Sequence, residues 1–330
     1  MSSDPIDVLA IGNAIVDVLA HADDAFLIEN KIEKGAMTLI DAAGAAALYD
    51  KMPAAVEVSG GSAANTAVGI AALGGQAAYI GKVRDDQLGE VFAHDIHAAG
   101  VLFQTAKAKH GPPTARCLIV VTPDAQRSMN TYLGACVELA PDDIDETLVA
   151  RSQVTYLEGY LYDPPAAKDA FHKAARLAKQ AGNKVSLTLS DAFCVDRYRR
   201  EFRDLVEGHI DILFANEAEI TSLYETATFD QALQVVRDKC ELAALTRSAA
   251  GSVIVRGDEV HVIDAKPVAK LVDTTGAGDL YAAGFLYGYT RGRHLLDCGR
   301  LGSLAAAEIV SHAGARPATE LSELAKQDGL

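Results

Sequence analysis

The chain has no tryptophan and few cysteines for its 330 residues. The cysteines are Cys117, Cys136, Cys194, Cys240 and Cys298. Their number is odd, they are widely scattered, and none are spaced as C-x-x-C, which argues against a disulfide framework and a zinc site. The histidines, including His110 and His209, show no metal-ligand spacing either and are expected at the surface or in the core. We therefore expect reduced, buried thiols and a cytoplasmic protein.

Positive charge is also scarce. Lys and Arg number 30 against 45 Asp and Glu, for a formal net charge of −15. Such an acidic surface repels nucleic-acid backbones and anionic lipid, so we expect neither as a partner. No apolar run reaches membrane length without a charge, and the apolar stretch near the start of the chain is interrupted by Asn13 and Asp17. We therefore expect no signal peptide and no membrane span.

The common nucleotide-binding motifs are missing as well. No G-x-x-x-x-G-K-[ST] occurs, which excludes a P-loop enzyme. The first apolar run leads into Gly12-Asn13-Ala14-Ile15, which lacks the G-x-G-x-x-G fingerprint of nicotinamide dehydrogenases. Gly276-Ala277-Gly278 also fails it, because Tyr281 stands at the third glycine position. Any nucleotide must be held by other means.

What the chain does have is an alternation of short apolar runs with amphipathic segments. Hydrophobic residues make up 49% and charged residues 23%, which is typical of a globular protein. The predicted buried strands are Val8–Gly12, Ala77–Ile80, Val154–Leu157, Val185–Leu189, Ile210–Phe214, Ala243–Thr246 and Val253–Val255. The predicted helices include Asp86–Ala99, Ala166–Ala181, Asp230–Lys239 and Ala277–Tyr289. This alternation predicts an α/β fold: a doubly wound, mostly parallel sheet with helices on both faces, in a single domain over residues 1–330.

Two regions interrupt the alternation, roughly residues 15–41 and 114–133. The first contains Ile15–His21 and Ala36–Asp41, both strand-like, with no long helix between them. The second, Thr114–Thr122 and Arg127–Leu133 around a Pro123–Asp124 turn, has the pattern of a β-hairpin. These segments could form a small β-sheet lid inserted in the α/β core, or an edge extension of the main sheet.

The first glycine-rich segment is Gly60-Gly61-Ser62-Ala63-Ala64-Asn65, which continues into small apolar residues. Paired glycines allow the backbone to approach a ligand closely. Ser62 is a plausible N-cap, and Asn65 in the first turn offers both a donor and an acceptor. Taken alone, the segment is better explained as a tight turn before a capped helix.

The second segment is Asp273-Thr274-Thr275-Gly276-Ala277-Gly278-Asp279, followed by an apolar helix. Gly276, Ala277 and Gly278 at a helix start present free backbone N–H groups to a phosphate or a developing negative charge. Asp279 beside them could accept the proton of an attacking hydroxyl while the N–H groups hold a transferred phosphoryl group. Its alternative role is to stabilise the helix N-terminus.

Together the two segments resemble those of the ribokinase-like family of carbohydrate and nucleoside kinases, the phosphofructokinase B type, and the resemblance covers essentially the whole chain. It implies a doubly wound α/β domain with a β-lid over the substrate, Asp279 as general base, and Gly276-Ala277-Gly278 as anion hole. One departure is Arg84, where family members usually have glycine, which affects the expected local turn. A regulator without catalysis would need a damaged version of this acid and anion site, and the site is intact.

The resemblance also implies further binding roles. Residues similar to the family's substrate-binding positions are Asn13, Asp17, Gly60, Gly61 and Asn65, with Arg127 as a candidate for charge stabilisation or closure. Residues similar to its ATP-binding positions are Asn216, Glu219, Thr246, Arg247, Gly251 and Thr275. The cofactors implied are ATP and Mg²⁺, the latter placed indirectly through Glu219, with K⁺ or another monovalent cation near Asp273. An N-x-x-E at 216–219 would otherwise be an ordinary helix start.

The substrate follows from two shorter similarities. Gly12–Asp17 and Arg127–Ala135 resemble bacterial members grouped with adenosine kinases, whereas the D-T-T-G-A-G-D form is equally typical of ribokinase-type sugar kinases. We therefore expect phosphorylation of the adenosine 5′-hydroxyl, with a ribokinase- or fructokinase-type sugar kinase as the alternative. The expected partner is a small nucleoside or sugar, and the resemblance is compatible with a homodimer.

Overall fold

The apolar runs form a nine-stranded sheet in this computed structural model, which describes residues 5–124 and 126–330. The strand order is β14-β13-β12-β11-β10-β9-β1-β5-β6. The strands are β1 (Ile6–Ile11), β5 (Ala77–Ile80), β6 (Leu102–Phe103), β9 (Ser152–Glu158), β10 (Lys184–Thr188), β11 (Ile212–Asn216), β12 (Leu242–Thr246), β13 (Ser252–Arg256) and β14 (Glu259–Ile263). Pairings from β6 to β12 are parallel, and β13 and β14 are antiparallel.

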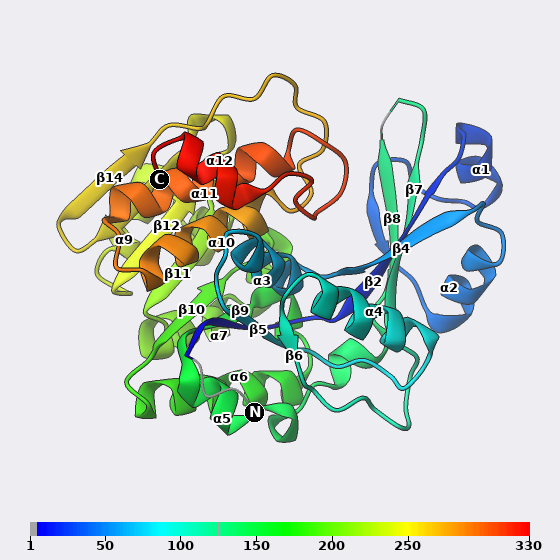
Figure 1. Cartoon of the computed structure of the whole chain (residues 1–330), viewed down its shortest axis with the longest axis horizontal. Helices are drawn as coiled ribbons and strands as arrows, with labels where there is room; N and C mark the ends of the chain where they lie inside the picture. Colours follow the sequence, from blue (N-terminus) through cyan, green and yellow to red (C-terminus); the bar gives the residue numbers. More distant parts are fainter. Residues whose placement is uncertain (1–4, 125) are drawn as a thin grey trace.

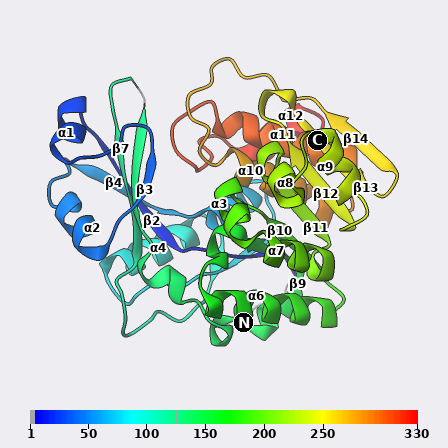
Figure 2. The same cartoon turned by 180° about the vertical axis from the view of Figure 1, so that it is seen from behind.

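Helices cover both faces of this large sheet because its strands are apolar on both sides. In β1, Val8 and Ala10 contribute to one core and Leu9 and Ile11 to the other. The first core includes α3 (Ser62–Ala72), α4 (Gln87–Ala98), α10 (Ala277–Thr290), α11 (Leu295–Ile309) and α12 (Leu321–Gln327). The second includes α5 (Glu146–Arg151), α6 (Pro165–Gln180), α7 (Ala192–His209), α8 (Glu217–Tyr224) and α9 (Phe229–Val236). Figures 1 and 2 show the two helical layers on either side of the sheet. The predicted fold class is confirmed.

A second sheet stands beside the large one (Figure 1). Its order is β3-β8-β7-β2-β4, with β2 (Ile15–His21), β3 (Met37–Leu39), β4 (Ala55–Gly60), β7 (Ala115–Val121) and β8 (Arg127–Tyr132). Two short helices, α1 (Asp24–Glu29) and α2 (Ala42–Tyr49), connect its first strands. The predicted small sheet is therefore confirmed, and the edge-extension alternative is wrong. The turn predicted at Pro123–Asp124 adjoins Ala125, which is outside the described residues.

Three local expectations change. β4, which the sequence analysis did not predict, ends at Gly60, so the first glycine-rich segment joins the small sheet to α3. Gly61 rather than Ser62 is the N-cap of α3, with a φ of 101° that suits glycine. Arg84 does not have a positive φ, so the turn there does not require the family's glycine. Within the described residues, no helix is long and apolar enough to cross a membrane.

Candidate active site

The first turn of α10 forms around glycine. Gly276 is the N-cap and has a left-handed φ of 80°, which a side chain would strain. The loop before it is braced by Asp273, whose carboxylate accepts hydrogen bonds from the Thr275 backbone N–H at 3.0 Å and hydroxyl at 2.7 Å. Thr275 thus shapes the loop from within. The Ala277 backbone N–H donates to the Thr274 carbonyl at 3.2 Å, so the N–H groups left without an intrahelical acceptor here are those of Gly278 and Asp279.

Asp279 lies in this turn and is held by α3. Its Oδ1 accepts a hydrogen bond from Ser62 Oγ at 2.6 Å, and its Oδ2 accepts one from Asn65 Nδ2 at 2.9 Å. Burial raises the pKa of Asp279 above its ordinary range, while these two hydrogen bonds and the charge of Arg316 oppose the rise. The two glycine-rich segments, far apart in sequence, therefore meet at one carboxylate whose proton affinity is higher than usual.

Gly278 borders free space on the other side of the turn. It is exposed, and a Cβ built on it would have no neighbour within 4 Å. An anion can therefore reach the N-terminus of α10 next to Asp279 without displacing protein atoms. The helix dipole and the free N–H groups favour negative charge at this point.

Glu158, at the end of β9, is a buried acid that the sequence analysis missed. It accepts hydrogen bonds from the Asn13 side-chain amide at 2.8 Å, the Asn13 backbone N–H at 3.2 Å and the Ala63 backbone N–H at 2.7 Å. Burial raises its pKa to about 7, although these donors lower it. Only glycine fits at position 12, because a Cβ there would lie 2.2 Å from Glu158 Oε2. Glu158 therefore fixes the start of α3 against β1.

Two predicted substrate residues carry buried amide oxygens without a partner in the structure: Asn13 Oδ1 and Asn65 Oδ1. Buried polar atoms are nearly always hydrogen-bonded in proteins, so each is available to a ligand hydroxyl or a water. Gly61, between them in the chain, packs so closely that a Cβ would lie 2.1 Å from the Asn13 carbonyl oxygen.

Asp17 brings the small sheet to this group. Its carboxylate lies against Gly60, where a Cβ would be 2.5 Å from Asp17 Oδ2. Burial raises the pKa of Asp17 to about 6, against the lowering effect of Arg316 and Arg127. The absence of a side chain at Gly60 therefore leaves room for the Asp17 carboxylate, on which the charges of Arg316, Arg127 and Asp279 act.

Arg316 is the second residue that the sequence analysis missed. It lies in the loop after α11 and donates to the Ser59 carbonyl at 2.6 and 3.0 Å and to the Ala64 carbonyl at 2.9 Å. It thereby ties the end of β4 to the start of α3, and its charge acts on both Asp17 and Asp279.

Arg127, in β8, forms an ion pair with Asp273. The same carboxylate also accepts the Gly314 backbone N–H at 3.0 Å. Burial alone would raise the pKa of Asp273, but the donors from Thr275 and Gly314 and the charge of Arg127 bring it below its usual value. The predicted monovalent-cation residue thus already has cationic and N–H partners.

The predicted nucleotide residues lie further along the same edge of the large sheet. Asn216 ends β11 and is paired in register with Thr246, which ends β12. Carboxyl ends of parallel strands are where open α/β sheets bind ligands. Asn216 and Glu219 form a capping box at the start of α8, with the Asn216 amide donating to Glu219 Oε1 at 2.6 Å. Locally, the N-x-x-E sequence at 216–219 is therefore a capped helix start.

Glu219 has features that suit an indirect role beside a cation. Burial raises its pKa to about 7, and the negative charge of Asp191 adds to this effect, while the Asn216 backbone lowers it. Both of its carboxylate oxygens accept hydrogen bonds from Asn216, which holds the carboxylate in place at the helix start. A nearby Mg²⁺ would favour the charged form that burial disfavours.

Arg247 and Gly251 shape the next turn. Arg247 donates to Glu217 at 3.0 Å, and its guanidinium lies 4.2 Å from the centre of the Phe229 ring, so the side chain is directed toward α8 and α9. Gly251 has a φ of 82°, and a Cβ there would lie 2.0 Å from the Ile263 carbonyl oxygen. The backbone of this turn, rather than the Arg247 side chain, borders the strand ends.

The small sheet carries apolar side chains on the same face as Asp17. Leu19 shares that face because it is two residues along β2, and the register places Ile119 and then Met129 beside it. Met37 pairs with Met129 and is 55% exposed, and Leu39 on the same strand is 56% exposed. We call Leu19, Met37, Leu39, Ile119 and Met129 the apolar face. Leu118 and Val120, which flank Ile119 on β7, are wholly buried on the other side of the sheet.

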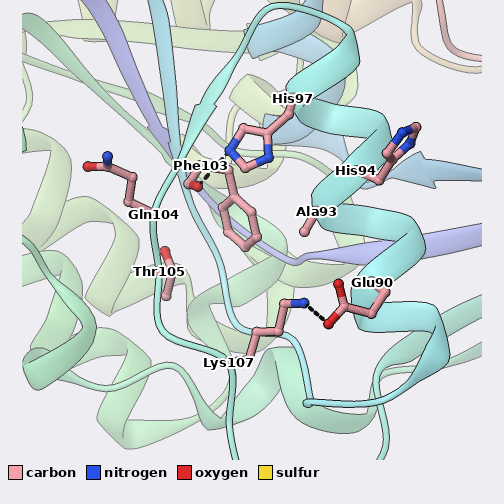
Figure 3. Close-up of a pocket in the computed structure, with 8 residues that line it drawn as sticks. All are labelled: Glu90, Ala93, His94, His97, Phe103, Gln104, Thr105 and Lys107. Atoms are coloured by element: carbon pink, nitrogen blue, oxygen red, sulfur yellow. Dashed lines mark hydrogen bonds and ion pairs between the residues drawn. The ribbon is translucent and has the colours of Figure 1, made fainter. Parts of the chain in front are cut away.

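The hollow in Figure 3 belongs to a different place. It lies between α4 and the segment after β6, and none of the residues above lines it. Two pairs of its polar groups bind each other, Lys107 with Glu90 and His97 Nε2 with the Phe103 carbonyl at 2.9 Å, whereas the Thr105 hydroxyl is buried without a partner in the structure. It is therefore not part of the candidate active site.

This arrangement agrees with the comparisons to known proteins. Residues 32–321 match the pfkB family carbohydrate kinase. The chain belongs to this family. Its sequence is 57% identical to that of the adenosine kinase from Sinorhizobium meliloti. The crystal structure of that protein matches this one with a TM-score of 0.90, over 98% of this chain and 99% of that one. It is 56% identical to the probable sugar kinase protein from Rhizobium etli CFN 42, with a TM-score of 0.91 and 99% of each chain covered. It is 28% identical to a Saccharomyces cerevisiae adenosine kinase, over 93% of this chain and 95% of that one.

Membership of the pfkB family establishes the class of chemistry. The chain is a kinase that acts on a hydroxyl group, and kinases of this family use ATP, generally with Mg²⁺. The geometry above must therefore accommodate a hydroxyl, a phosphoryl group and a nucleotide.

Proposed function

We propose that this kinase phosphorylates the 5′-hydroxyl of adenosine, converting ATP and adenosine to ADP and AMP. The observation that carries the proposal is the apolar face that lies beside Asp17 on the small sheet. A nucleoside has a flat, largely apolar base attached to a sugar with vicinal hydroxyls, so one ligand matches both parts. A free sugar would satisfy the polar groups but leave Met37 and Leu39 in water. The similarity to the Sinorhizobium meliloti adenosine kinase supports the same choice.

In this mechanism the ribose lies over the start of α3. Asp17 accepts hydrogen bonds from the ribose hydroxyls, and the partnerless oxygens of Asn13 and Asn65 are available to the same ligand. Gly60 and Gly61 allow this close approach. The 5′-oxygen would then point toward Asp279, the acid that joins α3 to α10.

Asp279 acts as the general base. It takes the proton of the 5′-hydroxyl as the new bond forms between that oxygen and the γ-phosphorus. The bond from the γ-phosphorus to the bridging oxygen breaks, and ADP leaves with the electron pair. The backbone N–H groups after Gly276 stabilise the charge on the transferred phosphoryl group. Ser62 and Asn65 orient the Asp279 carboxylate for this step.

The nucleotide would lie along the ends of β11 and β12, near Asn216, Thr246 and Gly251. When bound, Mg²⁺ neutralises the phosphate charges, and Glu219 would contact its water shell. Arg127 would close the small sheet over the substrate, excluding water that competes for the phosphoryl group.

The test is a radiometric phosphorylation assay with ATP and a panel of adenosine, other nucleosides, ribose and fructose. We expect kcat/KM for adenosine to exceed that for every free sugar by at least about 100-fold, because the apolar face is filled only by a base. A free sugar used as well as adenosine would instead support the sugar-kinase alternative, to which the Rhizobium etli protein's description points.

A further inference from the structure

Three potential metal ligands meet far from the candidate active site. Glu259 and His261 are on β14, and His294 is the N-cap of α11. Each offers a ligand atom, and the three atoms lie within 4.8 Å of one another. Among residues 5–124 and 126–330, these are the three acids, histidines or cysteines whose side chains lie close enough together to hold a metal ion.

The fold creates this cluster in two steps. Glu259 and His261 are two apart on a strand, so their side chains lie on one face of the sheet, which Ile263 continues. α11 packs on that face, since a Cβ on Gly299 would lie 2.7 Å from Ile263 Cγ1. The start of the same helix therefore brings His294 to His261, with ring centres 5.2 Å apart.

The side chains are already partly organised. His261 Nε2 lies 2.7 Å from Glu259 Oε1, and the other oxygen, Glu259 Oε2, accepts a hydrogen bond from Arg256 Nε at 3.0 Å. This second contact orients the carboxylate and leaves Oε1 directed at the histidines. His294 Nδ1 accepts the Leu296 N–H at 3.4 Å, a long bond that hardly restrains the ring.

We propose that Glu259, His261 and His294 form a binding site for a divalent transition-metal ion of the zinc type. Two imidazoles and one carboxylate are a ligand set that suits Zn²⁺ and related ions and not Mg²⁺, which prefers oxygen. Zinc bonds of about 2.0–2.2 Å place tetrahedral ligand atoms roughly 3.3 Å apart, a distance within the spread of the three atoms here. His294 is exposed, so an ion can enter and a water can complete the coordination.

The position indicates a structural role. β13 runs antiparallel to β12, so Ser252 at its start pairs with Thr246 at the carboxyl end of β12. On β14, Ile263 pairs with Ser252, and Glu259 pairs with Arg256 at the other end of β13. The cluster therefore lies toward the amino ends of the parallel strands, and Asp279 lies at the opposite edge. A bound ion would join the edge strand β14 to α11, and its effect would be on stability.

The experiment uses untagged, chelator-treated protein, with Zn²⁺ and Co²⁺ as probes in calorimetry and absorption spectroscopy. We expect one ion per chain, tetrahedral Co²⁺ bands in the visible spectrum that Zn²⁺ abolishes, and a rise in the unfolding temperature with Zn²⁺. His261→Gln and His294→Asn should each weaken Zn²⁺ binding at least about tenfold. The second change keeps a good N-cap, so α11 should remain intact.

The matched control is His172→Ala. His172 contacts His209 with ring centres 5.4 Å apart, a similar histidine pair outside the three-ligand group. This variant should bind Zn²⁺ like the unchanged protein. Unaltered Zn²⁺ affinity in both His261→Gln and His294→Asn, or equal competition by Mg²⁺, would overturn the proposal.

Discussion

The Arg127 guanidinium in the small sheet forms an ion pair with the Asp273 carboxylate in the loop before α10. Both side chains are largely buried, with exposed fractions of 11% and 9%. A single contact therefore couples the hairpin β7–β8 to the loop that precedes the anion site. If the small sheet is a mobile lid, this pair stabilises its closed position.

The first prediction concerns Arg127→Gln. Without the ion pair, the amides of 127–132 should exchange hydrogen faster in the free enzyme, because closure becomes less favourable. Adenosine should restore protection in β2, β7 and β8 together, while the large sheet changes little. Arg116→Gln is the control, since Arg116 lies on the opposite face of β7 against Tyr49. Equal exchange in the small sheet with and without adenosine would mean that it does not close.

Asp279→Asn should lower kcat by roughly 10²–10⁴-fold, the usual effect of removing a general base. Nucleotide affinity should be largely retained. The control is Asp297→Asn, because Asp297 is likewise an acid in the first turn of a helix, α11, and pairs with Arg300 of the same helix. If both variants keep near-normal turnover, Asp279 only stabilises a helix N-terminus and is not the base.

Gly278→Ala tests the anion site without disturbing the fold. The added methyl group meets no protein atom within 4 Å, so the unfolding temperature should change little. It would occupy the space where the phosphoryl group is expected, and kcat should fall by about 10-fold or more, comparable to partial loss of an anion hole. Gly208→Ala in α7 also meets no atom within 4 Å and provides the control. Full activity of Gly278→Ala would place the phosphoryl group elsewhere.

Asp17→Ala should weaken adenosine binding by roughly 10- to 100-fold and ATP binding far less, since charged hydrogen bonds to the ribose hydroxyls are lost. Isothermal calorimetry with each ligand measures this difference. Glu57→Ala is the comparison, because Glu57 lies on the other face of the small sheet and accepts the Tyr49 hydroxyl. Equal losses for adenosine and ATP would contradict the assignment of Asp17.

Glu158 predicts a pH dependence of stability. Its pKa is about 7 in the folded protein against an ordinary 4.5, so the folded state binds more protons between these values. The free energy of unfolding should therefore fall as pH rises from about 4.5 to about 7, with Glu158 contributing about 3 kcal/mol of that fall. Glu158→Gln should reduce this slope in urea titrations across the range. Glu146→Gln, at an exposed site, should leave the slope unchanged.

The parts of the site that could be predicted from sequence are those whose chemistry is local. Gly276, Gly278 and Asp279 stand in one helix start, and the spacing of glycine and acid shows the N–H groups and the carboxylate together. Glu158 and Arg316 act only through tertiary contacts. Glu158 ends an ordinary apolar strand, where its position before Gly159 was the available signal, and Arg316 occupies a loop without a motif.

The same limit applies to the fold. Six of the seven parallel strands of the large sheet were predictable because each is a continuous apolar run, whereas the two-residue β6 is too short to give such a signal. β4 was missed because its apolar residues, Val56 and Val58, are too few to distinguish it from the loop before Gly60. The group of Glu259, His261 and His294 was missed because the histidines are close only after α11 packs on β14.

α10 packs closely on α3 on one side and on α11 on another, which leaves little room to adjust its position. A Cβ on Gly69 of α3 would lie 2.6 Å from Ala283 of α10, and one on Gly284 of α10 would lie 2.3 Å from the Leu301 carbonyl oxygen of α11. Substitutions there would shift Asp279 relative to Ser62 and abolish turnover for every acceptor alike. In the apolar face, by contrast, Met37 and Leu39 are exposed side chains that can change size without moving these helices. Evolution toward a new acceptor would therefore proceed by replacing residues such as Met37 and Leu39, while the phosphoryl-transfer machinery is inherited unaltered.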